Sequence, residues 1–342
     1  MSDDLRIGLV GCGGISGHHL KAWQTVPGVK VVAVCDIVPE RAQTAAETYE
    51  AEPFTDMAEM LKKAAFDAVD ICAPSGLHAE MGIMAAEAGK HVMTEKPIDI
   101  DLAKIDRLIE TADRRGVKLG CIFQHRFGPH ISKARQLIQE GKIGRIISCS
   151  TYVKWWRTQE GYYDKDAWRG TWALDGGVLG NQGIHSIDQM CWMAGPVAEV
   201  EYAYIDTIER NIEAESFGIA VVRFENGARG VVEGTTNCYP GMATRTQIFG
   251  TKGSAEFDGG KVGSFKVLGE EIDLETAEDQ DKDGRSDPLA IGLGGHAAQL
   301  YDFVQAIRED RSPQCDGPAA RVAVDCLTKI YRKAGYTGKL GT

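Results

Sequence analysis

The sequence predicts two domains: an α/β domain with a doubly wound parallel sheet, followed by an α+β domain with a large open antiparallel sheet. The chain has 342 residues, more than one hydrophobic core usually organises. Apolar runs of strand length alternate with helix-length segments at first, and closely spaced strand candidates follow. We therefore place the domains at residues 1–124 and 125–342, with the C-terminal helices packing back on the body.

The first domain contains five apolar runs that we expect to form strands covered on both faces, because each run is continuously apolar. They read LRIGLV, VKVVAVC, AVDICA, HVMT and VKLGCIF. Helix-length segments separate them, over residues 39–50, 77–88 and 102–115. This alternation of strand and helix implies a parallel sheet.

The second domain is expected to begin with a helix over residues 131–140. The strand candidates that follow read IGRIISCSTYVKW, VAEVEYAYID, SFGIAVVRFENG, ARGVVEGTTN, TRTQIFGT and SAEF. Their close spacing and turn signals such as Asn226-Gly227 are typical of an antiparallel sheet. Two more helices are expected over residues 295–309 and 319–334.

An acidic stretch, ETAEDQDKDGRSD, precedes those last helices. Asp279, Asp281 and Asp283 match the start of a calcium-binding loop, but the twelfth position is Ala290 where a bidentate glutamate is needed. We expect a solvated loop.

Charge and composition restrict the partners. The formal net charge of -11 and the pI near 5.3 argue against broad binding to nucleic acid or to an anionic membrane. The N-terminal sequence lacks the basic region and apolar stretch of a secretory signal, so we expect a cytoplasmic protein. Nine cysteines without a C-x-x-C pair indicate buried thiols rather than a disulfide framework.

A glycine-rich turn, GCGGISG, follows the first strand and opens a helical stretch. Two glycines at a spacing of two permit a tight turn and a close approach to a pyrophosphate, which then lies at the helix N-terminus. The residues of this turn expected to bind the dinucleotide are Gly11, Gly13, Gly14 and Ile15.

Asp36 ends the second strand, 25 residues after Gly11. A carboxylate there can accept hydrogen bonds from the adenine ribose and would repel a 2′-phosphate, so NAD is favoured over NADP. Arg41 leaves some room for NADP. The alternative for Asp36 is a strand-ending residue that only begins a turn.

Two loops follow the next parallel strands, at the sheet edge where open α/β sheets bind ligands. The residues expected to bind the cofactor there are Pro74, Ser75, His78, Glu95 and Lys96. Oxidation of a secondary alcohol also needs a base within hydrogen-bond reach of the hydroxyl. A lysine pKa of about 10.4 could fall towards about 7 to 8 near a cationic nicotinamide, so Lys96 is the candidate; a surface lysine in a salt bridge is the alternative.

The stretch LDGGVLGNQGIHSID raises a second group of candidates. If a helix begins near Gly180, then Asn181, His185 and Asp188 share one face. A metal site, an acid/base pair or a capped helix with a buried histidine would each fit. One histidine, one aspartate and one asparagine are few ligands for a transition metal, so we expect no metal.

Four motifs occur in one order along essentially the whole chain: Gly11-x-Gly13, Pro74-x-x-x-His78, Glu95-Lys96-Pro97, and Gly176-Gly177 before His185-x-x-Asp188. Together they resemble the glucose-fructose oxidoreductase and inositol dehydrogenase family. The resemblance implies an N-terminal Rossmann domain, NAD(P) with its nicotinamide near Lys96, and an open sheet that serves oligomerisation, as a homodimer or homotetramer. It also implies that Lys96 transfers the proton.

The family often has Asp-x-Gly-x-His-x-x-Asp, but this chain has Asn181 at the first position. Asn181 can orient a hydroxyl and cannot accept a proton, so catalysis is expected to rest on Lys96 and His185. Asp188 would either fix the imidazole tautomer or brace the helix.

Residues 152–172 hold four of the six tryptophans. Aromatic faces cover sugar rings and arginine forks bind carboxylate or phosphate, so this stretch is a candidate pocket wall. The residues expected to bind substrate are Lys96, Arg157, Tyr163, Trp168, Arg169, Asn181 and His185.

The predicted function is the NAD-dependent oxidation of a secondary hydroxyl of a sugar, inositol or sugar derivative, by hydride transfer to nicotinamide. The asparagine version of the motif is similar to that of members that oxidise sugar C3. Two alternatives remain open. One is an NAD-dependent glycoside hydrolase that acts by transient oxidation and elimination, and the other is a non-catalytic sugar or dinucleotide sensor.

Overall fold

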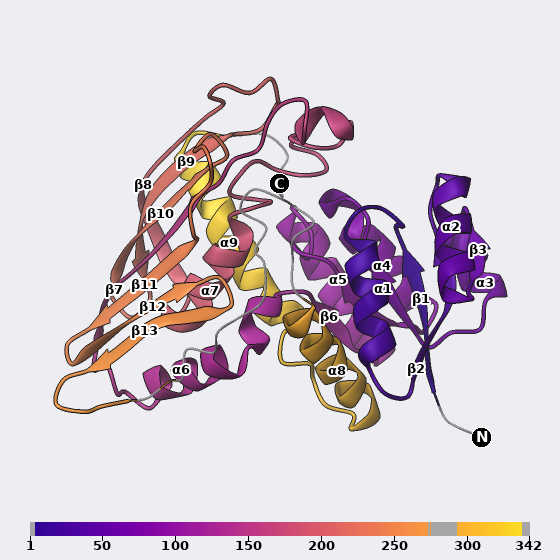
Figure 1. Cartoon of the computed structure of the whole chain (residues 1–342), viewed down its shortest axis with the longest axis horizontal. Coiled ribbons are helices and arrows are strands. Elements are labelled where there is room, and N and C mark those ends of the chain that lie inside the picture. The colour runs from indigo at the N-terminus through magenta and orange to yellow at the C-terminus, as the bar shows by residue number, and fades with distance from the viewer. Residues whose placement is uncertain (1–3, 273, 275–292, 337–342) are drawn as a thin grey trace. The chain divides into compact units, whose positions relative to one another are not determined.

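The computed structural model describes residues 4–272, 274 and 293–336 (Figure 1). These residues form two compact units, one of residues 4–122 with 293–321, the other of 123–272 and 274 with 322–336. The chain passes from the first unit to the second after residue 122, close to the boundary predicted at residue 124. Residues 293–321, which were predicted from the sequence to lie in the second domain, belong to the first unit. The acidic stretch with Asp279, Asp281 and Asp283 lies outside the described residues.

The first unit is built on a six-stranded parallel sheet with the order β3-β2-β1-β4-β5-β6. Its strands are β1 (Leu5–Val10), β2 (Val29–Cys35), β3 (Glu52–Phe54), β4 (Ala68–Ile71), β5 (His91–Thr94) and β6 (Leu119–Cys121). The strand order reverses at β1 and β4. Ligands of doubly wound sheets bind at the carboxyl ends of the strands beside such a point.

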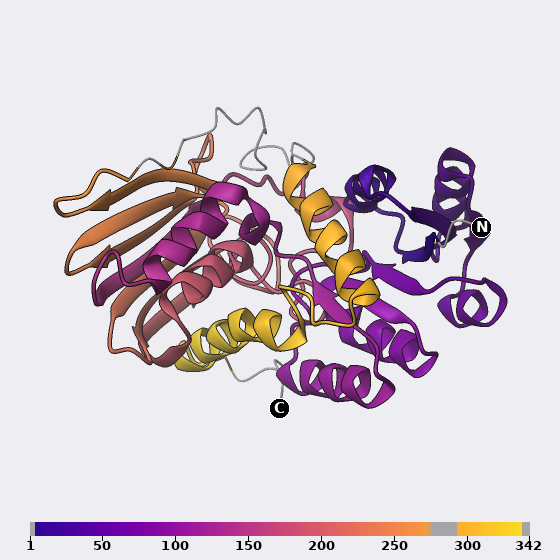
Figure 2. The ribbon, with the colours of Figure 1, turned by 90° about the horizontal axis from the view of Figure 1, so that it is seen from below.

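The α-helices described in this unit are α1 (Ser16–Thr25), α2 (Pro39–Tyr49), α3 (Met57–Lys63), α4 (His78–Glu87), α5 (Leu102–Arg115) and α8 (Gly294–Arg308). The helix α8 packs on α1 although the two are far apart in sequence (Figures 1 and 2).

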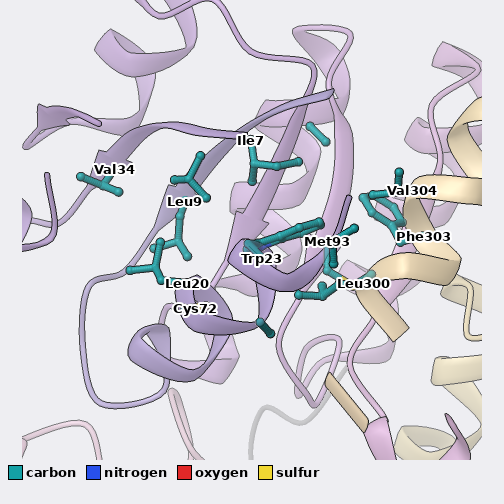
Figure 3. Packing of buried hydrophobic residues seen from close by; sticks show 14 of the residues in the cluster. Ile7, Leu9, Leu20, Trp23, Val34, Cys72, Met93, Leu300, Phe303 and Val304 are labelled. Atoms are coloured by element: carbon teal, nitrogen blue, oxygen red, sulfur yellow. The ribbon is translucent and has the colours of Figure 1, made fainter. Parts of the chain in front are cut away.

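The core of the first unit explains why α8 belongs to it. Ile7 on β1, Trp23 on α1 and Phe303 on α8 are at most 1% exposed and belong to one apolar cluster (Figure 3). Burial of side chains of this size contributes roughly 1.5 to 3 kcal/mol each. The chain therefore returns to the first unit to complete its core.

The second unit is built on a seven-stranded sheet with the order β13-β12-β11-β7-β10-β9-β8. Its strands are β7 (Ile146–Lys154), β8 (Val197–Asp206), β9 (Phe217–Phe224), β10 (Arg229–Thr235), β11 (Arg245–Gly250), β12 (Gly253–Asp258) and β13 (Lys261–Val267). Neighbouring strands are antiparallel except β7 and β10, which run parallel. The predicted fold class is confirmed, with this one parallel pair in the antiparallel sheet.

The helices α6 (Pro129–Gln139), α7 (Ile184–Ala194) and α9 (Gly317–Lys333) lie along one face of this sheet (Figures 1 and 2). Strands β9 and β10 alternate buried and part-exposed residues, as expected when one face is covered. On the other face Tyr202, Tyr204 and Phe249 are about half exposed, at 56%, 46% and 46%. These aromatic side chains are exposed to solvent on that face of the sheet.

Among the described helices, none has the length and the apolar character needed to cross a membrane.

The placement of α8 can be tested by truncating one side chain. Phe303→Ala should lower the free energy of unfolding of the first unit by about 3 to 5 kcal/mol, because it leaves a cavity in the cluster. Urea denaturation followed by tryptophan fluorescence measures this loss. The matched control is Tyr301→Ala, because Tyr301 lies on the same helix but is 47% exposed. Equal effects of the two substitutions would contradict the placement.

Candidate active site

The glycine-rich turn lies between β1 and α1. Gly11 has φ +91°, and a Cβ on it would lie 2.6 Å from the carbonyl carbon of Cys72, so only glycine fits. A Cβ on Gly13 would meet nothing within 4 Å. The N-cap residue of α1, Ile15, has no side-chain acceptor for the first helical N–H groups. This open, uncapped helix start fits a dinucleotide pyrophosphate.

Asp36 follows β2 and contacts the same turn. Its Oδ2 accepts a hydrogen bond of 2.8 Å from the Cys12 amide, and its Oδ1 accepts one of 2.8 Å from the Val38 amide. Asp36 therefore shapes the turn after β2 as well as the glycine-rich turn. Both alternatives raised by the sequence are compatible with this arrangement, because each carboxylate oxygen has a second lone pair for a ribose hydroxyl.

The loop after β4 is tied to the loop after β5 by His78. Its Nδ1 lies 2.7 Å from the carbonyl oxygen of Pro97, and its Nε2 lies 2.7 Å from that of Ala73. The ring is 1% exposed. This geometry favours a role in holding the two loops together over direct contact with the cofactor. Ser75, in the same loop, begins a short 3-10 helix.

Glu95 and Lys96 follow β5 directly. Glu95 is 6% exposed, its Oε1 lies 2.9 Å from Nε2 of His19, and its Oε2 accepts a 3.0 Å hydrogen bond from the Lys96 amide. Burial alone would raise the pKa of Glu95, but the hydrogen bond from His19 and the neighbouring His296 outweigh it and hold the pKa well below its usual range. The Glu95 side chain therefore fixes the backbone of the loop that carries Lys96.

His19 lies at the centre of the two described side-chain groups whose ligand atoms are close enough to hold a metal ion, one with Asp70 and Cys72, the other with Glu95 and His296. Its Nδ1 lies 2.8 Å from Asp70, and its Nε2 lies 2.9 Å from Glu95. These are hydrogen-bond distances between a ring N–H and a carboxylate. The contacts favour a hydrogen-bonded cluster over a metal site.

In the second unit, the turn before α7 is held by a buried glutamate. The Oε1 atom of Glu215 accepts hydrogen bonds from the Leu179 amide, at 2.9 Å, and from the Tyr331 hydroxyl, at 2.8 Å. Its backbone oxygen accepts a third from the Val178 amide, at 2.9 Å. A Cβ on Gly177 would overlap the Glu215 carboxylate, which explains why glycine stands there.

This turn corrects one expectation. The helix α7 begins at Ile184 rather than near Gly180, so Asn181 lies in the turn before the helix and not on one helical face with His185. The Gly183 amide bonds at 2.7 Å to the carbonyl oxygen of Val178, five residues back, so the regular α-helical pattern of bonds begins only after this turn.

Asn181 bonds to a carboxylate from elsewhere in the same segment. Its Nδ2 donates to Oδ1 of Asp175 and, at 3.3 Å, to the hydroxyl of Tyr162. Asp175 is 2% exposed, and its Oδ2 accepts a 2.6 Å hydrogen bond from the Gly170 amide. The family pattern has a carboxylate at position 181. Here Asn181 stands at that position, and Asp175 places a carboxylate beside it. The sequence signal was Asp175 directly before the glycine pair.

His185 and Asp188 lie on α7 but have different neighbours. The His185 ring is half-buried and lies 5.0 Å from the ring of His125 and 5.9 Å from that of Phe123, centroid to centroid. Asp188 is 2% exposed and forms a bidentate ion pair with Arg126. Burial raises the pKa of Asp188, and Arg126 opposes that effect. Asp188 therefore braces the unit through Arg126, as one of the two sequence interpretations held.

The aromatic stretch forms a stack around Tyr162. The guanidinium of Arg169 lies 4.3 Å from the Tyr162 ring and 4.5 Å from the Trp168 ring, and that of Arg157 lies 5.4 Å from Tyr162. Arg169 and Trp168 are half-buried, whereas Arg157 is 4% exposed. The hydroxyl of Tyr163 lies 2.9 Å from Oγ1 of Thr236.

Comparison with known proteins identifies the two units. Residues 5–123 match the model of the oxidoreductase family with an NAD-binding Rossmann fold, and residues 131–256 match the GFO/IDH/MocA C-terminal domain. The chain belongs to the GFO/IDH/MocA family. The family membership and the NAD-binding fold that the motifs predicted are thereby confirmed.

Several characterised members of the family are similar to this one. Inositol 2-dehydrogenase of Salmonella typhimurium is 30% identical over 74% of this chain and 73% of its own, and levoglucosan dehydrogenase of Pseudarthrobacter phenanthrenivorans is 30% identical over 75% and 74%. The crystal structure of the WlbA dehydrogenase from Bordetella pertussis in complex with NADH and UDP-GlcNAcA is 34% identical, with a TM-score of 0.86 and 97% of both chains covered.

Sequence reasoning missed the residues that support the site in this GFO/IDH/MocA protein. His19 and Asp70 hold Glu95, Glu215 and Tyr331 hold the turn before α7, and Arg126 holds Asp188. Each pairs with a residue far away in the chain, so local spacing contains no signal for it.

The buried Glu215 carboxyl gives a pH-dependent stability. Burial raises its pKa from 4.5 to about 8, although the Leu179 amide and the Tyr331 hydroxyl oppose the shift and Asp175 adds to it. Between these two values the folded protein keeps a proton that the unfolded chain releases. The stability from this group is complete below pH 4.5 and is lost as the pH rises to about 8.

Glu215→Gln, which is neutral at every pH, should remove this loss. From pH 5 to pH 8, the unfolding free energy of the variant should rise relative to that of the wild type. The slope against pH should correspond to about one proton. Denaturant titrations at several pH values measure it. A difference that stays constant across this range would contradict a protonated Glu215.

Proposed function

We propose that the protein is an NAD-dependent dehydrogenase that oxidises a secondary hydroxyl of a sugar derivative, with Lys96 as the acid/base. The observation that carries the proposal is the position of Lys96. It follows β5 at the carboxyl edge of an NAD-binding parallel sheet, and its amide is bonded to the Glu95 carboxylate. Ligands of such sheets bind at this edge.

The residues of the first unit fit NAD. The uncapped start of α1 would hold the pyrophosphate, Gly13 would leave room for it, and Asp36 would offer carboxylate oxygens to the ribose. When bound, the nicotinamide accepts the hydride from the alcohol carbon. We assign the cofactor contacts to Gly11, Gly13, Gly14, Ile15, Asp36, Pro74, Ser75, Glu95 and Lys96, and give His78 the role of holding the two loops together.

Lys96 performs the proton step. Its Nζ accepts the proton of the substrate hydroxyl during oxidation and returns it during reduction. General acid–base catalysis of this kind raises the rate about 10²- to 10⁴-fold. His185 is the second group assigned to proton transfer or to orientation of the hydroxyl. Asn181, with its amide held by Asp175 and Tyr162, orients the substrate and takes no proton.

The substrate is proposed to carry an anionic group. Arg169 lies half-buried on the rings of Tyr162 and Trp168, a setting in which a guanidinium binds carboxylate or phosphate with little loss of side-chain freedom. The complex of the WlbA dehydrogenase with UDP-GlcNAcA supports this class. We keep Arg157, Tyr163, Trp168 and Arg169 as substrate-side residues; Tyr163, bonded to Thr236, would act through its ring.

The oligomeric state is proposed from the uncovered sheet face. Exposed aromatic side chains at Tyr202, Tyr204 and Phe249 are costly in water, and a second copy would cover them. This supports a homodimer or homotetramer. The cytoplasmic location stays a prediction.

The substrate class can be tested by NADH absorbance. The purified protein should reduce NAD to NADH when a nucleotide-linked sugar acid such as UDP-GlcNAcA is the substrate. The rate should be lower with neutral inositols or levoglucosan, and lower again when NADP replaces NAD. Hydrolysis of nitrophenyl glycosides that needs NAD but accumulates no NADH would instead identify the hydrolase alternative. Sugar binding without turnover of any of these compounds would identify the sensor.

Lys96→Met should lower kcat by about 10² or more, because methionine keeps the length of the side chain and removes the base. NAD affinity, measured by fluorescence titration, should change only a few-fold. The control is Lys63→Met, because Lys63 lies exposed on α3 in an ion pair with Glu59. Wild-type turnover by folded Lys96→Met with normal NAD affinity would reject the assignment.

A further inference from the structure

A buried cluster of ionisable side chains joins the helix after the glycine-rich turn to the Lys96 loop. The His19 ring on α1 is 0% exposed, with Nδ1 2.8 Å from Oδ2 of Asp70 and Nε2 2.9 Å from Oε1 of Glu95. Asp70 lies on β4 and Glu95 follows β5. One imidazole therefore connects one helix with two neighbouring strands of the sheet.

The contacts imply a positive charge between two negative charges. Carboxylates only accept hydrogen bonds, so both ring nitrogens must carry a proton for both contacts to be made. Burial alone would lower the pKa of His19, but Asp70 outweighs it and raises the pKa well above its usual range. Removal of the ring would leave two carboxylates together in a buried setting, which is costly.

The cluster acts on Lys96 through Glu95. The Glu95 amide donates to the carbonyl oxygen of Ile71 at 2.8 Å, and its Oε2 accepts from the Lys96 amide at 3.0 Å. With Oε1 on His19 and Oε2 on the Lys96 amide, the carboxylate can take only one orientation that keeps both contacts. The rotation of the Glu95 side chain, and with it the start of the Lys96 loop, is thus set by a residue that lies in another element.

The same helix also carries the cofactor turn. The Ser16 hydroxyl donates to the carbonyl oxygen of Gly13 at 2.6 Å, and His19 follows Ser16 by about one helical turn. A rigid helix of ten residues thus holds the expected pyrophosphate site at its start and the Glu95 contact one turn later.

We propose that His19, backed by Asp70, is a positioning residue that holds Glu95 so that the Lys96 loop stays in register with the dinucleotide turn. The inference rests on the proposed function of Lys96 and assigns His19 no contact with substrate. It makes His19 necessary for the proton step and dispensable for NAD binding.

Other groups also face the cluster, and the test takes them into account. The described side chains are Trp23, whose Nε1 donates to Asp70 at 2.7 Å; His296 on α8, whose Nε2 lies 3.9 Å from Glu95; Cys121, whose Sγ lies 3.7 Å from the Glu95 carbonyl oxygen; and Cys72, His18 and Lys96. His296 is the other cation candidate at Glu95, but its nitrogen is 1.0 Å farther away than that of His19.

The test is His19→Asn, whose amide lies where Nδ1 of the ring lies, so it keeps the Asp70 contact and loses both the Glu95 contact and the positive charge. We expect kcat to fall about 10-fold or more and NAD affinity to change less than about 3-fold. In the pH profile of kcat, the limb that depends on Lys96, and that Lys96→Met therefore abolishes, should move to higher pH. The reason is that the two carboxylates left without a cation stabilise the ammonium form of Lys96. In the wild type, ¹⁵N NMR should show the His19 ring doubly protonated at pH 8.

The matched control is Trp23→Phe, which removes the other donor to Asp70 and leaves the contact between His19 and Glu95. It should lower stability and keep the wild-type kcat and pH profile. If His19→Asn does not fold, His19→Ala serves, because it removes the contact with Glu95 and leaves space that water can fill. It should show the same loss of kcat.

A folded His19 variant with wild-type kcat and pH profile would overturn the inference, as would a neutral His19 ring at pH 8 or equal loss of kcat in Trp23→Phe. These outcomes are distinct from failure of the proposed function, which appears as activity retained in Lys96→Met. If Lys96→Met is inactive and the His19 variants behave as wild type, only the positioning role is wrong.

Discussion

The contact between His19 and Glu95 connects residues 76 positions apart in the chain, and the arrangement of the NAD-binding unit depends on it. Both side chains are withdrawn from water, so each relies on the other for a hydrogen bond that solvent cannot replace. Asp70 and the Lys96 amide occupy the remaining sides of the cluster. Because these partners come from a helix and two strands, none of the elements can shift alone without leaving a buried charge unpaired.

The second unit uses a similar device with a different charge. Glu215 accepts the Leu179 amide just as Glu95 accepts the Lys96 amide, so in each unit a buried carboxyl group holds the backbone of a loop that carries predicted site residues. Within the part of the chain that the structure describes, no cation forms an ion pair with Glu215, and burial raises its pKa to about 8. One loop is thus held by an ionised network, and the other by a group that gives up its proton in mildly alkaline solution.

Much of the fold follows from short-range patterns. The continuously apolar runs predicted the buried strands, but β3, with three residues, and α3, with seven, are too short to show a period, and β13 was not recognised. The pattern of an apolar helix face also does not indicate which core the helix packs on, so α8 was not assigned to the first unit from the sequence. The motifs located Lys96, Asn181 and His185, whereas the turn that holds Asn181 depends on Glu215, 34 residues later, and lay beyond any local signal.

The central claim is that Lys96 exchanges a proton with a substrate hydroxyl whose carbon faces the nicotinamide. A crystal structure of the protein with NADH and a nucleotide-linked sugar acid measures this most directly. The account predicts that Nζ of Lys96 lies within about 2.6 to 3.2 Å of that hydroxyl. A complex in which another side chain contacts the hydroxyl and Lys96 points away from both ligands would contradict it.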